Sequence, residues 1–371
     1  MTVNDKKLIE KIEEQKTVFL AKVQSREKMP KSKRVSGVNK VKKSENKLKL
    51  NKKLLEVIMD EKIELDVCLK QLKYLIYLGA DVKQKDENGV SLLMKSVKRG
   101  KGEIIDMLVE NGVDVKLKDK SGKTSLMWAV KEGQVDVVKA LVKNGADLEA
   151  KDIGGWTALM WAIEEGKGEM LNALMEMGAK MDVKSNDGVR ALMSASRNGH
   201  VDIFNILVEN GVDLEGRDKF FRNALTTASR YGQVEMVKLL AKNGVDINAK
   251  DENGKTALMG ACLKGDIEMV KALIENKADV NMRCFEGRTA LMEAVCGSNK
   301  EVVELLLQYG ADVNFKDKKG MNVFDLALEK GKKEIIEVLS KVHEEIKNKE
   351  GRNENLKFDK NLFMHWGRLK R

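Results

Sequence analysis

The chain has 371 residues, of which 34% are charged and 5% are aromatic, and its formal net charge is +10. No apolar run approaches the roughly 20 residues that a bilayer-spanning helix needs. The first residues also lack the apolar core of a signal peptide. This composition predicts a soluble cytoplasmic protein, and two other routes stay open: secretion without a cleaved signal, and nuclear import through a basic tail.

The positive charge is concentrated at the two ends of the chain. Residues 1–52 hold 16 Lys or Arg against 6 Asp or Glu, and residues 341–371 hold 9 against 5. The long middle section therefore holds 43 basic and 47 acidic residues and is slightly acidic. The basic isoelectric point describes the tails and says little about the rest of the chain.

The N-terminal tail divides into two predicted segments. Residues 1–28 could form a helix with one apolar side. Residues 29–52 carry 9 Lys or Arg against the single acid Glu45, which is typical of a solvated, largely disordered linker. Its KSKR run at 31–34 also resembles a patch for nuclear import or polyanion binding, so nucleic acid or an anionic surface is an alternative partner.

A repeat of 33 residues fills the middle of the chain. Residues 53–85 are predicted to be a degenerate N-terminal cap, and residues 317–341 a C-terminal cap. A fixed period of this length is typical of a solenoid, in which neighbouring repeats bury one another's apolar sides. Seven full units begin at Asp86, Asp119, Asp152, Ser185, Asp218, Asp251 and Cys284.

Each unit has the same local pattern, which predicts two short helices. A D-x-x-G turn comes first, and a residue whose hydroxyl can cap a helix follows at the sixth position in most units. A small Ala at the eleventh position lets the layers approach closely, and Gly residues end both helices. The capping residues are Ser91, Thr124, Thr157, Thr256 and Thr289.

These motifs resemble the ankyrin repeat family, whose pattern is D-x-x-G-x-T-P-L-H-x-A followed by a second helix and G-A-D-V-N. The resemblance covers about residues 53–341, with T-A-L-M in place of T-P-L-H. It implies an all-α ankyrin solenoid that serves as a non-enzymatic, monomeric protein-interaction scaffold. The Met residues that stand at the family's His position are expected in the core: Met94, Met127, Met160, Met193, Met259 and Met292.

The sequence shows no motif for catalysis, a cofactor or a metal. Its glycines recur at turn positions and do not form a phosphate-binding loop. None of the four cysteines lies in a C-x-x-C pair. This pattern favours a protein of a reducing compartment, where thiols stay free. Cys262 is expected to be buried, and His200 is expected to be structural.

Aromatic and Arg residues at the turns and the first helices are the candidate partner-binding residues. The resemblance implies that partners meet these turns, or fingers, and the inner side of the first helices. Aromatics and Arg often anchor interfaces, and we expect one patch centred on the unit from Asp218. Its members are Trp156, Phe220, Phe221, Arg222, Arg230, Tyr231, Phe285 and Arg288.

Two alternatives accompany this prediction. Phe220 and Phe221 could instead pack locally, because Phe221 stands where the other fingers have Gly. Trp128 and Trp161, at the tenth position of their units, are expected to belong to the core.

The C-terminal tail, residues 342–371, carries one further candidate motif. Leu362, Phe363, Trp366 and Leu369 would lie on one side of a short basic helix. This helix could dock into a partner groove or onto a membrane surface. The alternative is a tail that folds back on the last repeat or stays disordered.

Overall fold

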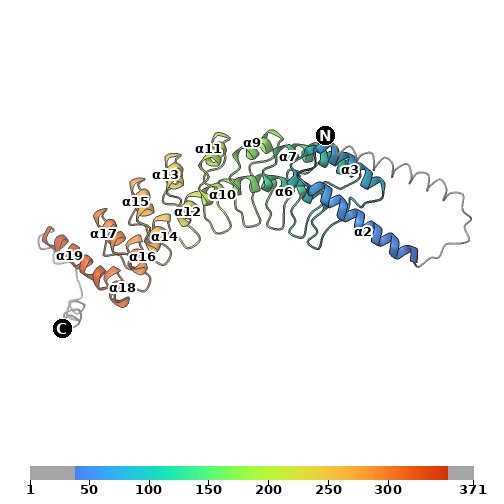
Figure 1. Ribbon diagram of the computed structural model, residues 1–371. Helices are drawn as coiled ribbons and strands as arrows, with labels where there is room; N and C mark the ends of the chain where they lie inside the picture. The colour runs from blue at the N-terminus through green and yellow to red at the C-terminus, as the bar shows by residue number, and fades with distance from the viewer. Residues whose placement is uncertain (1–37, 350–371) are drawn as a thin grey trace, which may run out of the picture. The chain divides into compact units, whose positions relative to one another are not determined.

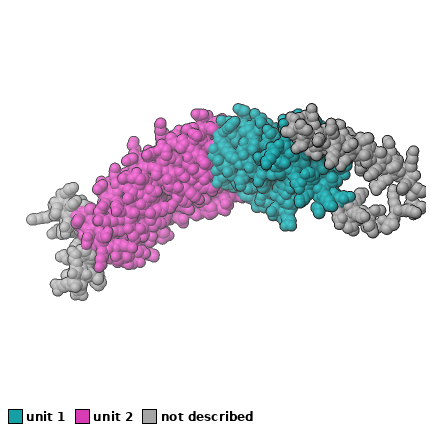
Figure 2. All heavy atoms as spheres, in the orientation of Figure 1, with its two compact units in different colours: residues 1–181 teal, residues 182–371 magenta. Residues whose placement is uncertain are grey.

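The computed structural model describes residues 38–349 of the chain (Figure 1). The expected helix over 1–28 and the expected C-terminal motif lie outside the described residues. The chain divides into two compact units, residues 1–181 and 182–371 (Figure 2), and each is described by itself. In the described part of both units the regular structure is helical, and extended pairing is limited to isolated bridges such as Lys118 with Thr124.

Unit 1 begins with a helical cap and continues as pairs of short helices. The outer helices, which follow the first helix of each repeat, have strongly amphipathic patterns and bury one apolar side. The elements are α2 (Val38–Met59), α3 (Leu65–Tyr77), α4 (Leu92–Ser96), the 3₁₀ turn η2 (Val97–Arg99), α5 (Gly102–Glu110), α6 (Ser125–Glu132), α7 (Val135–Lys143), α8 (Ala158–Glu164) and α9 (Gly168–Glu176).

Unit 2 repeats the same arrangement and ends in a longer helix. Figure 1 shows its first helices in one row and its second helices in another, with the fingers on the side of the first row. The elements are α10 (Ala191–Asn198), α11 (Val201–Glu209), α12 (Ala224–Arg230), α13 (Val234–Lys242), α14 (Ala257–Lys264), α15 (Ile267–Glu275), α16 (Ala290–Gly297), α17 (Lys300–Gln308), α18 (Val323–Glu329) and α19 (Lys333–Lys349).

The N-terminal cap starts earlier than the sequence pattern indicated. The boundary expected at residue 52 falls inside α2, so the later part of the basic segment is helical. The apolar side chains of Leu54, Val57 and Ile58 are buried and hold this helix on the first repeats. Lys47 also forms an ion pair of 3.0 Å with Asp81 of the next turn. Apolar spacing at the end of the basic run therefore outweighs its charge.

The first helices start with the caps that the sequence predicts. The hydroxyls of Thr124, Thr157, Thr256 and Thr289 accept a hydrogen bond from the backbone N–H of the Met three residues later. All six Met residues of this series are buried, which confirms their place in the core. The unit from Asp218 uses Asn223 instead, in a reciprocal capping box with Thr226.

Hydrogen bonds also join each finger to the next within a unit. The Asp at the first position accepts the turn's N–H groups, as Asp251 does from Asn253 and Lys255. The N–H at the second position then donates to the carbonyl at the third position of the preceding finger. In unit 2 these bonds run from Glu252 to Phe220 (3.2 Å) and from Phe285 to Asn253 (3.1 Å). Because these bonds join backbone groups, most changes of side chain leave the register of the fingers unchanged.

Candidate functional site

The tenth position of each repeat lies on the face formed by the first helices and the fingers, which we call the inner face. In unit 1 this position carries Lys95, whose ammonium pairs with Asp86, and two tryptophans, Trp128 and Trp161. Both are half-buried, and each indole N–H donates over 3.1 Å to Oδ2 of the Asp that opens its own finger, Asp119 and Asp152. The expectation that these tryptophans belong to the core is wrong, because their polar edge satisfies a finger carboxylate.

Trp156, the candidate in unit 1, packs against this inner face. Its ring centroid lies 5.7 Å from that of Trp161, with the two planes tilted by 46°. The ammonium of Lys123, from the finger of the preceding repeat, lies 4.0 Å from the centroid of the Trp161 ring. Offset aromatic pairs and cation–π contacts of this kind stabilise a surface. Trp156 therefore has a local structural role in addition to any role in binding.

Unit 2 carries small or acidic residues at the tenth position. These are Ser194, Thr227, Gly260 and Glu293. An ideal Cβ added at Gly260 would meet no atom within 4 Å, so the inner face is hollow there. Three hollows adjoin one another on this part of unit 2, because they share lining residues.

The finger of the unit from Asp218 presents two phenylalanines in different ways. Phe220 is half-buried, with the guanidinium of Arg222 4.7 Å from its ring centroid. Arg222 is in turn held by Asp218, since its Nε donates over 2.7 Å to Oδ2 of that buried carboxylate. The local-packing alternative thus describes Phe220.

Phe221 does not pack locally. It takes the Gly position of the finger with φ +58°, the left-handed conformation that costs a residue with a side chain about 1–2 kcal/mol. Its side chain is nevertheless 59% exposed. The turn hydrogen bond from its N–H to the Asp218 carbonyl is kept at 3.1 Å. The finger therefore displays an aromatic ring at a cost in backbone strain.

The first hollow brings three of the predicted residues together. Phe220, Arg222 and Arg230 line a space of about 200 Å³ with residues of the next finger. A second hollow of about 250 Å³, which we call the slot, lies between α12 and α14. It is lined by Arg222, Thr226, Ser229, Arg230, Asp251, Lys255, Thr256, Ala257, Gly260, Leu263 and Lys264.

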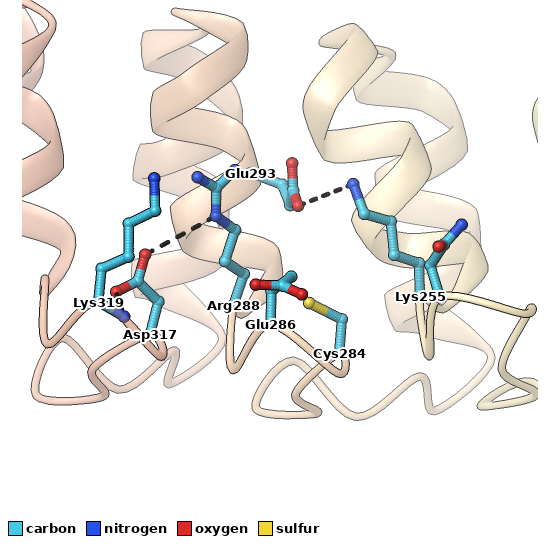
Figure 3. A pocket seen from close by; sticks show the side chains of 8 residues that line it. Lys255, Cys284, Glu286, Arg288, Glu293, Asp317 and Lys319 are labelled. Atoms are coloured by element: carbon cyan, nitrogen blue, oxygen red, sulfur yellow. Dashed lines mark hydrogen bonds and ion pairs between the residues drawn. The ribbon is translucent and has the colours of Figure 1, made fainter.

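The third hollow, of about 450 Å³, contains a buried acid (Figure 3). Glu293 is 1% exposed. Its Oε1 lies 3.0 Å from Nζ of Lys255, and the two groups form an ion pair without a hydrogen bond. Nε of Arg288 lies 3.9 Å from the buried Asp317. Figure 3 shows Lys255 and Arg288 extending from their fingers toward the helix that carries Glu293.

The remaining predicted residues of unit 2 are Tyr231, Phe285 and Arg288. Tyr231 follows α12 and is 52% exposed, whereas Phe285 is 59% exposed and covers the finger glycine Gly254. Arg288 lines the third hollow. The sequence prediction missed Gly260 and Glu293, which a comparison of the tenth position along the repeats would have found. It placed Lys255 among the finger residues of this face but did not count it as a binding residue.

Cysteine and metal chemistry add little to this site. All four cysteines are free; burial raises the pKa of Cys262, which is fully buried as expected, and also that of Cys68. Among the described residues no group of His, Cys, Asp and Glu is arranged to hold a metal ion. Within the same range, none of the helices is both long enough and apolar enough to cross a membrane.

Paired short helices, hydrogen-bonded fingers and a period of 33 residues define the chain as a helical repeat protein. A family model described as ankyrin repeats in three copies matches residues 65–152, 149–218, 214–284 and 281–350. The chain therefore belongs to the ankyrin repeat family, and the resemblance seen in the sequence is confirmed. No curated protein is found to match it. Ankyrin repeats are commonly protein–protein interaction modules and are typically non-catalytic.

Proposed function

We propose that the chain is a non-enzymatic scaffold that binds a protein partner along the inner face and the fingers of its ankyrin repeats. In unit 2 the contact would centre on Phe220, Phe221, Arg222, Arg230 and Tyr231. Phe285 and Arg288 of the later repeat would extend it. Trp156 would contribute from unit 1.

The observation that carries this proposal is the display of Phe221. A glycine at this position would relieve the backbone strain and remove an exposed aromatic ring from water. The chain instead has a phenylalanine there, and Tyr231 and Phe285 of unit 2 are exposed as well. Exposed aromatic groups of this kind are typical of the anchors of protein interfaces.

The hollows support a protein partner over a small molecule. They adjoin one another through shared residues and hold cations and carboxylates side by side. Ligand sites for small molecules are mostly apolar and enclosed. A continuous surface lined by this many charged side chains is better matched by a segment of another protein.

The proposal is tested by site-specific photo-crosslinking in cells that produce the full chain. A photoreactive phenylalanine analogue replaces Phe221 in one version and Tyr309 in another. Tyr309 is a matched control, because it is 52% exposed, as Tyr231 is, but follows the second helix α17. We expect a discrete protein adduct from position 221 and none from position 309.

The same adduct should disappear in a chain that also carries Phe220→Ala and Tyr231→Ala. For the purified partner, this pair should weaken binding at least about tenfold, since interface anchors often carry that much. The chain should stay folded, with a modest drop in melting temperature from the lost contact of Phe220 with Arg222. A Tyr309→Ala variant should bind normally. Equal adducts from both positions, or loss of folding with unchanged affinity per folded molecule, would overturn the proposal.

A further inference from the structure

The slot of unit 2 occupies the register position that an indole fills in unit 1. In the repeats from Asp119 and Asp152 the tenth residue is Trp, and its N–H donates over 3.1 Å to Oδ2 of the first-position Asp. The repeat from Asp251 keeps this acceptor but has Gly260 at the tenth position. The repeat from Asp251 therefore keeps the acceptor of this hydrogen bond but has no indole of its own to donate to it.

The acceptor in the slot is available. Oδ1 of Asp251 accepts the backbone N–H groups of Asn253 and Lys255, each at 2.9 Å, and no described residue donates to its Oδ2. The floor of the slot is apolar, with the buried Ala257 beside Gly260 and the partly exposed Leu263. An apolar floor with one carboxylate at its edge fits a flat apolar ring that carries a single donor.

One edge of the slot is cationic. Arg230 has no ion-pair partner within residues 38–349, and Nζ of Lys264 bonds only to the carbonyl of Arg230. The other two cations of the slot are already balanced, Arg222 by Asp218 and Lys255 by Glu293. A ligand carboxylate at this edge could pair with two cations, Arg230 and Lys264, which no acidic side chain of residues 38–349 balances.

From this arrangement we infer that the slot binds a tryptophan side chain of a protein partner, within an acidic segment. The indole lies on Ala257 and Gly260 and donates its N–H to Oδ2 of Asp251. A neighbouring carboxylate of the partner pairs with Arg230 and Lys264. The inference deepens the proposed function and rests on it, because it names the chemistry of the partner at one part of the same face.

The test uses the purified full chain and a phage-displayed library of random dodecapeptides. We expect the selected peptides to be enriched in Trp with Asp or Glu close by. The affinity of a selected synthetic peptide is then measured by fluorescence anisotropy for the wild type and for two variants. Gly260→Trp fills the slot with the residue that the repeats from Asp119 and Asp152 carry at this position. Arg230→Glu reverses the charge at the cationic edge.

Both variants should weaken the affinity for the peptide by at least about tenfold, the loss expected for an anchor residue. A matched control, Lys242→Glu on the second helix α13, should leave the affinity within about twofold, because it reverses a charge outside the slot. Circular dichroism melting shows that each variant is folded.

Peptides that lack Trp, or that are basic, would overturn the inference, as would binding that Gly260→Trp leaves intact. So would a selection that yields no binding peptide. None of these outcomes removes the adduct expected at position 221, so the inference can fail while the proposed function stands.

Discussion

The inner faces of the two units differ at the tenth position of the repeat that they share. Unit 1 has Lys95, Trp128 and Trp161 at the tenth position, and each of them satisfies the first-position carboxylate of its own finger. Unit 2 has small residues or an acid there, and its inner face is hollow around Gly260 and Glu293. The scaffold positions are the same in both units, since the eleventh-position alanines are buried throughout.

This difference teaches how a repeat protein gains a binding surface without a change of fold. The finger hydrogen bonds and helix caps keep the geometry, and a single variable side chain decides between a covered and an open face. In the repeat from Cys284 the acidic residue stands at the tenth position instead of the first. The first-position acid is absent there, and Glu293 at the tenth position takes its place opposite Lys255.

The largest expected effect comes from leaving the buried acid of unit 2 without its cation. In Lys255→Met the carboxylate of Glu293 loses the ammonium 3.0 Å away but stays buried. The free energy of unfolding should fall by about 3 kcal/mol, the lower end for breaking a buried pair, because Lys255 itself is partly exposed. Urea unfolding followed by circular dichroism measures it.

A double variant separates the charge from the packing. Lys255→Met with Glu293→Leu replaces both charges by apolar groups, and such replacements are often neutral. We expect most of the lost stability to return. A single variant as stable as the wild type would mean that the pair does not hold Glu293.

In unit 1 the corresponding change is Trp161→Ala. It removes the tilted ring contact with Trp156, the cation–π contact of Lys123 and the hydrogen bond to Asp152. Because the ring is only half-buried, we expect a loss of about 2 kcal/mol, below the range for a fully buried Trp. Ile153→Ala, an exposed apolar residue of the same repeat, should change stability by less than about 0.5 kcal/mol in the same denaturation experiment.

The strained finger of unit 2 gives a prediction of the opposite sign. Phe221→Gly should stabilise the chain by about 1 kcal/mol, because glycine adopts a positive φ without steric cost. Lys277→Gly is the matched control, since Lys277 has φ +69° at a helix end. Both should raise the melting temperature, but only Phe221→Gly should weaken the partner. If Phe221→Gly lowers the melting temperature, the ring contributes to packing.

The smallest effect concerns the titration of a finger carboxylate in unit 1. Burial acts to raise the pKa of Asp119, but hydrogen bonds from Ser121, Lys123 and Trp128 lower it below the ordinary value. A depressed folded pKa adds stability above the unfolded pKa of about 3.9, and this is lost as the pH falls through the folded pKa. Trp128→Phe removes one donor, so the pKa of Asp119 should rise and acid unfolding should begin at a higher pH.

Carbon-detected NMR titration of the Asp119 carboxyl group follows this change directly. Asp86, whose pKa is lowered first by its hydrogen bond with Lys95, serves as the internal reference. Its titration should not move in Trp128→Phe. Equal shifts at both carboxylates would show a general effect of the substitution.

The repeat pattern predicted the fold because every structural position is encoded locally. Thr caps, Gly stops and the buried Met series follow from spacing alone, and the structure has them where the sequence indicated. The direction of the tenth residue could not be read from spacing. It depends on the carboxylate of the finger, to which Trp128 and Trp161 turn their N–H groups. The start of α2 was missed for a similar reason, since its burial depends on the helix that it covers.

Hydrogen bonds between adjacent fingers also bear on how the chain matures during translation. Each bond joins residues about one repeat apart, such as Glu252 with Phe220 and Phe285 with Asn253. Contacts this local favour fast folding, and segments can fold in sequence as they leave the ribosome. A nascent chain of this kind would expose the apolar side of only its newest repeat, and a ribosome that stalls within one unit would still release a largely folded product.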